Sequence, residues 1–142
     1  MSASQYSVVV CLSSVFCMPS NATVIAADVV QEGATILTVT ERGFGKRTPL
    51  EEYRLQGRAG KGIIDIKTGG RNGNVVGMLQ VHDTDDILVM TTKGKIIRMH
   101  VADISSQGRN TWGVRIIDLE ADDRVGSIAR VDAETPAPAP AQ

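Results

Sequence analysis

The sequence predicts an all-β fold of about two repeated units, each a four-stranded blade of roughly 50 residues in a propeller-like arrangement. Three observations predict it. A stretch of the chain recurs at a fixed spacing, short runs rich in β-branched residues are broken by glycine turns, and helical periodicity is absent. At 142 residues the chain has room for one compact domain, and with 4% aromatic residues its core must be aliphatic.

The repeat is read directly from the residues. Ile36–Lys67 aligns with Ile87–Asp118 at a constant offset of 51 without a gap, and ten of the 32 aligned positions are identical. Glycine and arginine recur in register, which indicates two copies of one structural unit. The identical pairs are Ile36/Ile87, Leu37/Leu88, Thr40/Thr91, Gly43/Gly94, Arg47/Arg98, Gln56/Gln107, Gly57/Gly108, Arg58/Arg109, Gly62/Gly113 and Ile66/Ile117.

The strands follow in order within each unit. The runs "TILTVTE" and "DILVMTT" lead through Arg-Gly and Lys-Gly into a second run, which predicts a hairpin at the start of each unit. "GKGIIDIKT" and "GVRIIDL" read as third strands, and "VVGMLQV" and "VGSIARV" as fourth strands. "TVIAADVV" at 23–30 is expected to supply a strand ahead of the first unit.

The chain therefore divides into a repeat region at 23–131, with units around 35–81 and 86–131, and two ends without repeats. Residues 1–22 form an apolar extension, and the Pro/Ala-rich residues 132–142 are expected to be a disordered tail. The apolar run at 8–18 is too short to span a bilayer and has no preceding Lys or Arg, so we expect a cytoplasmic protein. The small residues of "SNA" at 20–22 leave a signal peptide as the alternative.

Charge is distributed unevenly along the chain. The net charge is −1, so bulk electrostatics indicates neither nucleic acid nor membrane. From Glu41 to Arg71, however, eight lysines and arginines face four acids, and from Lys93 to Arg115 five face one, a balance of +4 in each case. Acids gather between the units and near the C-terminus, so each unit has a basic middle and an acidic junction.

Equivalent arginines on successive blades would form regularly spaced cations along one rim. Such a rim suits the phosphate backbone of duplex DNA, which is contacted without reading bases. The glycines of the first loop would let backbone N–H groups approach a phosphate, and no aromatic set is interleaved for single strands. The candidate DNA-binding residues are Arg47, Arg58, Lys61, Arg98, Arg109, Lys46 and Lys95.

Structural interpretations stand beside this one. Arg47 and Arg98 could instead pair with Glu52 and Asp103 and fix a strand, and the repeated glycines could serve only as turns. Trp112 is expected to pack in the core or between blades rather than to contact DNA.

The sequence contains little that indicates an enzyme. It has no phosphate-binding loop and no nucleophile elbow, and His82 and His100 lie 18 residues apart on different expected strands. Tyr53 has no neighbouring general base. Cys11 and Cys17 lack the partners of a zinc site. We therefore expect no catalytic residue, no cofactor and no metal.

Taken together, "ATILTVTERGFGKRTPLEEYRLQGRAGKGIIDIKT" and "GRNTWGVRIIDLEADDRVGSIARV" resemble the C-terminal domain of the A subunits of DNA gyrase and topoisomerase IV, in its later repeats. The resemblance implies a partial β-pinwheel whose basic perimeter binds and bends duplex DNA during supercoiling. It also implies an accessory, non-catalytic module, because the cleavage domain of that family is absent from these residues.

The family's signature pattern is Q-[RK]-R-G-G-[RK]-G, and five of its seven positions fit here. Through this resemblance Arg58 and Lys61 inherit a DNA contact, and Arg47, Arg98 and Arg109 inherit a rim role. The expected partners are duplex DNA, other copies of the chain through exposed blade faces, and gyrase subunits, but no membrane. The alternative is a self-assembling or protein-interaction module without DNA wrapping. The degenerate copy of the box is Gln56, Gly57, Arg58, Ala59, Gly60, Lys61 and Gly62.

Overall fold

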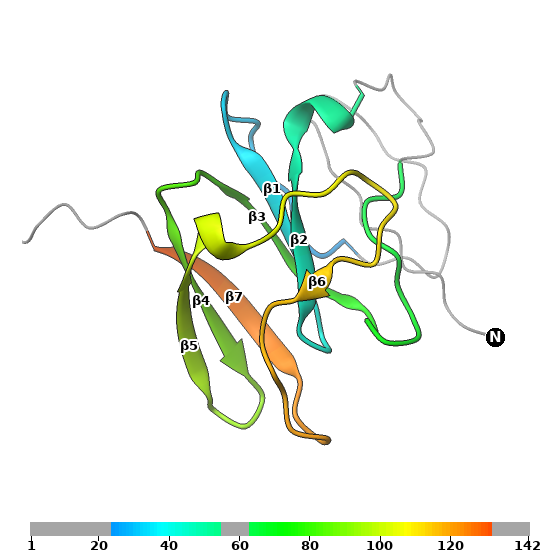
Figure 1. Cartoon of the computed structure of the whole chain (residues 1–142), viewed down its shortest axis with the longest axis vertical. Coiled ribbons are helices and arrows are strands. Elements are labelled where there is room, and N and C mark those ends of the chain that lie inside the picture. Colours follow the sequence, from blue (N-terminus) through cyan, green and yellow to red (C-terminus); the bar gives the residue numbers. More distant parts are fainter. Residues whose placement is uncertain (1–23, 55–62, 132–142) are drawn as a thin grey trace, which may run out of the picture.

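A computed structural model describes residues 24–54 and 63–131 of the chain. They form two antiparallel sheets (Figure 1). The four-stranded sheet has the order β3-β1-β2-β6, and the three-stranded sheet has the order β5-β4-β7. The strands are β1 (Thr35–Thr40), β2 (Phe44–Pro49), β3 (Val75–Val81), β4 (Asp86–Thr91), β5 (Ile96–His100), β6 (Val114–Arg115) and β7 (Val125–Val131).

Each unit opens with the expected hairpin, β1–β2 in the first and β4–β5 in the second. Gly43 and Gly94 close the two turns at φ 84° and 88°, a conformation that favours glycine. Each hairpin runs into a single 3₁₀ turn, η1 (Leu50–Glu52) and η2 (Val101–Asp103), 51 residues apart. The hairpin and the 3₁₀ turn that follows it therefore form one motif that occurs in both units.

The third strands differ from the expectation. The segment "GVRIIDL" contributes only the two-residue strand β6, which pairs with β2 of the first unit rather than with its own hairpin. In the first unit, the described part of "GKGIIDIKT" makes one isolated bridge, between Ile66 and Thr111. In the first blade the fourth strand, β6, comes from the second unit. The second blade has no such strand among the described residues, and so it has three strands there.

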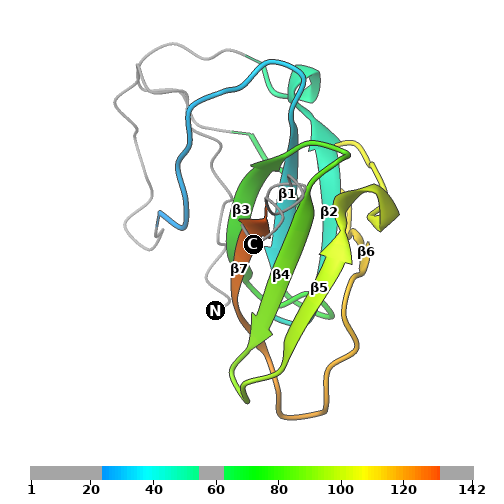
Figure 2. The ribbon, with the colours of Figure 1, turned by 90° about the vertical axis from the view of Figure 1, so that its left-hand side faces the viewer.

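The core lies between the two sheets, which Figure 2 shows with the three-stranded sheet in front of the other. It is aliphatic, as the composition predicts. Its buried members come from both units, so the two blades share one apolar layer. They are Leu37, Val39, Val81, Ile87, Val89, Val101, Ile104, Ile117 and Val125.

The expected leading strand at 23–30 is wrong for the described residues. Residues 24–31 form no strand, and Val24, Val29 and Val30 are exposed. The Gln80 side chain holds this segment, because its Oε1 accepts a hydrogen bond from the Gln31 N–H at 2.7 Å. Nothing in the described parts of the chain is a helix long and apolar enough to cross a membrane.

Candidate nucleic-acid interface

Two segments from different units lie side by side, 63–73 and 105–115, hereafter the paired segments. The Asn110 N–H donates to the Asp65 carbonyl at 2.6 Å, and the Lys67 N–H donates to the Thr111 carbonyl at 2.8 Å. Each paired segment follows a Gln-Gly-Arg sequence or contains it. These bonds therefore bring a segment of the first unit beside a segment of the second, although the two occupy different positions in the repeat.

The paired segments are basic. They carry Lys67, Arg71, Arg109 and Arg115 against a single acid, Asp65, which is buried. Lys67, Arg71 and Arg115 are exposed, and Arg109 is half-buried. The paired segments thus carry an excess of positive charge, which favours polyanions.

Three of these cations lie over two aromatic rings. The Arg71 guanidinium is 4.8 Å from the Phe44 ring centroid and 5.8 Å from that of Trp112. The Lys67 ammonium lies 5.7 Å from the Trp112 centroid, and the Arg115 guanidinium 5.7 Å from that of Phe44. We call these five residues the aromatic–cation cluster. Each of these cations is thus supported by a ring, and a guanidinium that stacks on a ring keeps its N–H donors at its edge, where they can bond an acceptor.

The side chain of Asn72 holds the loop between Lys67 and Gly73 in place. Its buried side-chain amide donates to the Lys67 carbonyl at 2.7 Å and to the Trp112 carbonyl at 2.8 Å. Arg71 adds a hydrogen bond to the Gly113 carbonyl at 3.1 Å. These bonds join the two paired segments at the cluster, so the ring and the cations keep a defined arrangement.

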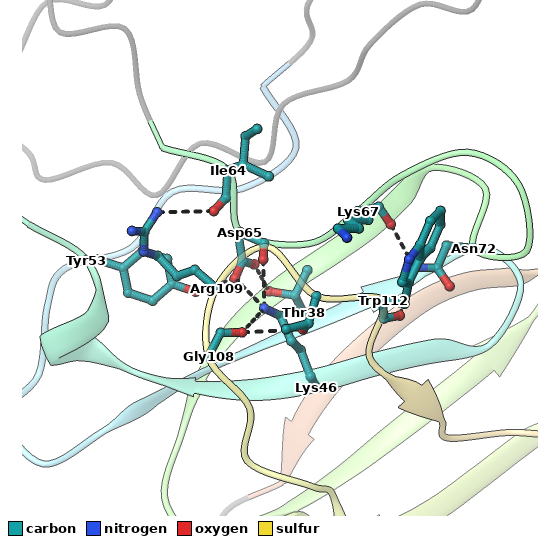
Figure 3. Close-up of polar contacts among 11 residues, drawn as sticks. Thr38, Lys46, Tyr53, Ile64, Asp65, Lys67, Asn72, Gly108, Arg109 and Trp112 are labelled. Atoms are coloured by element: carbon teal, nitrogen blue, oxygen red, sulfur yellow. Dashed lines mark hydrogen bonds and ion pairs between the residues drawn. The ribbon is translucent and has the colours of Figure 1, made fainter.

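A buried polar network lies under the same face (Figure 3). The Lys46 ammonium donates to the Asp65 carbonyl at 2.7 Å and to the Gly108 carbonyl at 2.6 Å. The Asp65 carboxylate accepts from Thr38 and from Tyr53, each at 2.5 Å. Lys46 therefore links the segment that follows the first Gln-Gly-Arg sequence to the glycine within the second.

Burial changes the protonation chemistry of this network. Loss of solvent lowers the pKa of Lys46, although the Asp65 carboxylate opposes that shift. Burial, together with Asp65, raises the pKa of Tyr53 well above its ordinary value, so the phenol stays protonated and donates. The bonds of this network tie Asp65 to β1, to Tyr53 and to Lys46, and so hold the paired segments in place.

Lys46 and Arg47, two of the expected DNA contacts, lie inside the structure. Lys46 is fully buried, and Arg47 is 9% exposed. The Arg47 Nε donates to the Ile104 carbonyl at 2.8 Å, and its guanidinium pairs with Asp83. The structural interpretation of Arg47 thus holds in kind but with a different acid from Glu52. Burial argues against direct phosphate contact by either side chain.

The other expected contacts lie nearer to solvent. Lys95 is exposed on the second hairpin, and Arg98 is partly exposed with its Nε 2.8 Å from Asp86 Oδ2. Arg109 donates to the Ile64 carbonyl at 3.4 Å beside the buried network. The degenerate box, Gln56 to Gly62, with Arg58 and Lys61, lies outside the described residues.

The structure adds residues that the sequence reasoning missed. Lys67 and Arg71 have acids at the equivalent positions of the other unit, and Arg115 has Ile64. They escaped notice because the selection centred on arginines that recur in both units and on lysines beside the recurring residues. Trp112, expected to pack, is 39% exposed and contacts the loop at 67–71. Within residues 24–54 and 63–131, no group of three His, Cys, Asp or Glu side chains is placed to bind a metal.

Relatives of the chain are found by sequence. It is 53% identical over 93 residues to the DNA gyrase A subunit of Haloquadratum walsbyi, and this alignment covers 66% of this chain and 11% of that protein. It is 49% identical over 100 residues to the Haemophilus influenzae protein of the same name, covering 70% and 11%. It is 46% identical over 115 residues to the Staphylococcus aureus one (strain NCTC 8325), covering 78% and 13%. The chain thus spans 11% to 13% of the length of these relatives.

Solved structures match the fold. The C-terminal domain of DNA topoisomerase IV superposes with a TM-score of 0.67 at 28% identity, covering 74% of this chain and 33% of that one. The DNA gyrase A C-terminal domain gives a TM-score of 0.62 at 26% identity, covering 71% and 34%. The family model described as "DNA gyrase C-terminal domain, beta-propeller" matches twice, at residues 34–82 and 85–132, one match for each unit. The chain belongs to the family of the DNA gyrase C-terminal domain, and its two units are blades of that β-propeller.

Proposed function

We propose that this chain is a non-catalytic module that binds duplex DNA through its phosphate backbone, tolerates any sequence, and bends the duplex along the paired segments. The observation that carries the proposal is the aromatic–cation cluster, with three exposed cations held over two rings. Phosphate contacts fix a protein on DNA without reading bases, so these residues predict affinity without sequence preference.

The local charges support this use of the face. Arg71 spends one N–H on the Gly113 carbonyl at 3.1 Å, and a guanidinium carries five N–H donors. Arg115 lies 3.4 Å from the exposed Asp118 carboxylate, an ion pair of little energy that a phosphate can replace. We include the exposed Lys95 and Arg98, the half-buried Arg109, and Arg58 and Lys61 of the box as further proposed contacts.

The experiment is a fluorescence anisotropy titration of a labelled duplex of about 40 base pairs at several salt concentrations. The test variant is Lys67→Gln/Arg71→Gln/Arg115→Gln, and the control is Lys93→Gln/Arg124→Gln/Arg130→Gln, which removes the same charge outside the paired segments. Removal of one phosphate-binding cation lowers the log–log salt slope by about 0.9, so the slope of the test variant should fall by about 2.7. Equal effects of the two variants would refute the assignment of this face.

A second candidate function is a self-assembling or protein-interaction module that keeps the blade fold. The exposed strand β5, which lies at the edge of its sheet in the described residues, favours it. The relatives are named as A subunits of DNA gyrase, so we also propose gyrase subunits as partners. Absence of duplex binding at low salt, together with self-association or capture of a gyrase subunit, would select this candidate.

A further inference from the structure

One short strand of the second unit pairs into the sheet of the first and forms part of the joint between the two blades. β6 belongs in sequence to the second unit and pairs antiparallel with β2 of the first, with Phe44 opposite Arg115 and Gly45 opposite Val114. The Ile116 N–H extends the joint by donating to the Gly43 carbonyl at 2.8 Å. The residues before β6 continue the cover, because the Arg47 N–H donates to the Ser105 carbonyl at 3.1 Å.

Among residues 24–54 and 63–131, the equivalent strand of the second blade has no third strand paired to it. At the offset of 51 residues β5 is equivalent to β2, and yet its five residues are alternately exposed and half-buried, whereas the four central residues of β2 are buried. Lys46 is 0% exposed and its equivalent, Ile97, is half-buried. Gly45 is buried, while its equivalent, Ile96, is 62% exposed.

The first unit contains the segment that would fit this edge. Ile63 and Ile64 are equivalent to Val114 and Arg115 of β6. Ile64 is 45% exposed, and the Asp65 N–H, the equivalent of the Ile116 N–H that donates in the joint, makes no hydrogen bond within the described residues. We propose that Ile63–Ile64 of one copy of this chain pairs with β5 of a second copy, in the register of the β2–β6 joint.

The side chains are complementary in this register. Ile63 would stand opposite Ile96, and Ile64 opposite Lys95, so two exposed isoleucines become covered. In the observed joint the residue at position 45 must be glycine, because a Cβ there would lie 2.4 Å from Ile116 Cδ1. In the joint between copies Asp65 takes the place of Ile116, and its carboxylate is turned inward to Thr38 and Tyr53, which leaves room for Ile96.

This contact joins two different surfaces, so it is head-to-tail and repeats from copy to copy until a ring closes or a filament grows. The solved domains indicate the closed form. This chain covers 33% and 34% of the two solved C-terminal domains, so three copies match one complete domain. We therefore expect a trimer of about 46 kDa, three times 15.2 kDa. The inference does not depend on DNA binding.

The test is the mass of the full chain by light scattering over a range of concentrations, for wild type, Ile64→Lys and Ile96→Lys. Wild type should reach three times the monomer mass, and each variant should be monomeric. An equimolar mixture of the two variants should form a dimer that does not grow, because each keeps one intact surface. The control Val29→Lys changes another exposed residue, 59% exposed, and should assemble like wild type.

Several results would overturn the inference. These are a wild type that stays monomeric at every concentration, an Ile64→Lys variant that still assembles, and a variant mixture that stays monomeric. Circular dichroism establishes that each variant is folded, and if a lysine variant is not, Ile64→Ser or Ile96→Thr replaces it. Because the readout is mass without DNA, failure here leaves the duplex-binding proposal standing, and failure of duplex binding leaves this one.

Discussion

The Lys46 ammonium lies 3.4 Å from Oδ1 of Asp65, and both side chains are fully buried. The same ammonium donates to backbone carbonyls of both units, at Asp65 and Gly108. At the equivalent position the second unit has Ile97, an apolar residue. The pair therefore replaces apolar packing in the first blade with an internal link between the paired segments.

Lys46→Met should destabilise the fold strongly. It leaves the buried Asp65 carboxylate without its cation, and breaking such a pair costs about 3–5 kcal/mol. Urea unfolding measures the change, with Lys95→Met as the matched control. Lys95 is exposed, so its substitution should stay within about 0.5 kcal/mol. Equal stability of the two variants would contradict the structural role given to Lys46.

Gly113→Ala should weaken the joint between the blades. Gly113 has φ 72°, and a Cβ there would lie 2.7 Å from the Gly45 carbonyl oxygen. Strain and clash together should cost more than about 1 kcal/mol in unfolding free energy. Gly33 has φ 77° and open space around it, so Gly33→Ala measures the backbone strain without a clash. Gly108 also has open space around it, and Gly108→Ala should be almost neutral. A Gly113→Ala variant no less stable than Gly33→Ala would refute the close approach.

Asp86 should give the fold an acid-sensitive contribution. Its carboxylate lies 2.6 Å from His100 Nδ1 and accepts from Arg98 at 2.8 Å, and these bonds hold its pKa below the ordinary 3.8. A folded-state pKa below the unfolded one adds stability that is complete above about pH 4 and is lost as pH falls through the lowered pKa. The difference in unfolding free energy between wild type and Asp86→Asn should therefore shrink from pH 5 to pH 2. A difference that stays constant over this range would contradict the bonding.

Trp112→Leu should reduce duplex affinity without changing net charge. The ring supports Lys67 and Arg71. Each exposed pair of this kind contributes about 0.5–1 kcal/mol, which corresponds to about 2- to 5-fold in affinity for each pair. Anisotropy titration at fixed salt measures the loss, and Val29→Ala is the control at an exposed apolar residue away from the cluster. Unchanged affinity would show that the ring does not orient the cations.

The hairpins could be predicted from the sequence because the information is local. The β-branched run Thr35–Thr40 and a glycine that adopts positive φ at 43 determine the first of them. The partner of β6 is determined by tertiary packing, and the sequence of a two-residue strand carries too little information to predict it. The run at 23–30 has strand composition but no partner among the described residues, and β-propensity acts through pairing and burial.

The candidate site was less accessible to sequence reasoning for a related reason. Identity between two units selects residues that make the common fold, and Arg47 proved to be one of them, buried against Ile104 and Asp83. The cluster residues Lys67, Arg71 and Trp112 have no identical counterparts in the other unit. A comparison of the two units by their differences in charge would have drawn attention to them.

Trp112 is the only tryptophan of the chain, and it lies within the aromatic–cation cluster. Its fluorescence during titration with unlabelled duplex is therefore the most direct test of the central claim. If DNA occupies this face, the emission should change in proportion to binding, quenching by acrylamide should fall, and added salt should reverse both. Duplex that binds by anisotropy while Trp112 emission and its quenching stay unchanged would show that the DNA lies elsewhere.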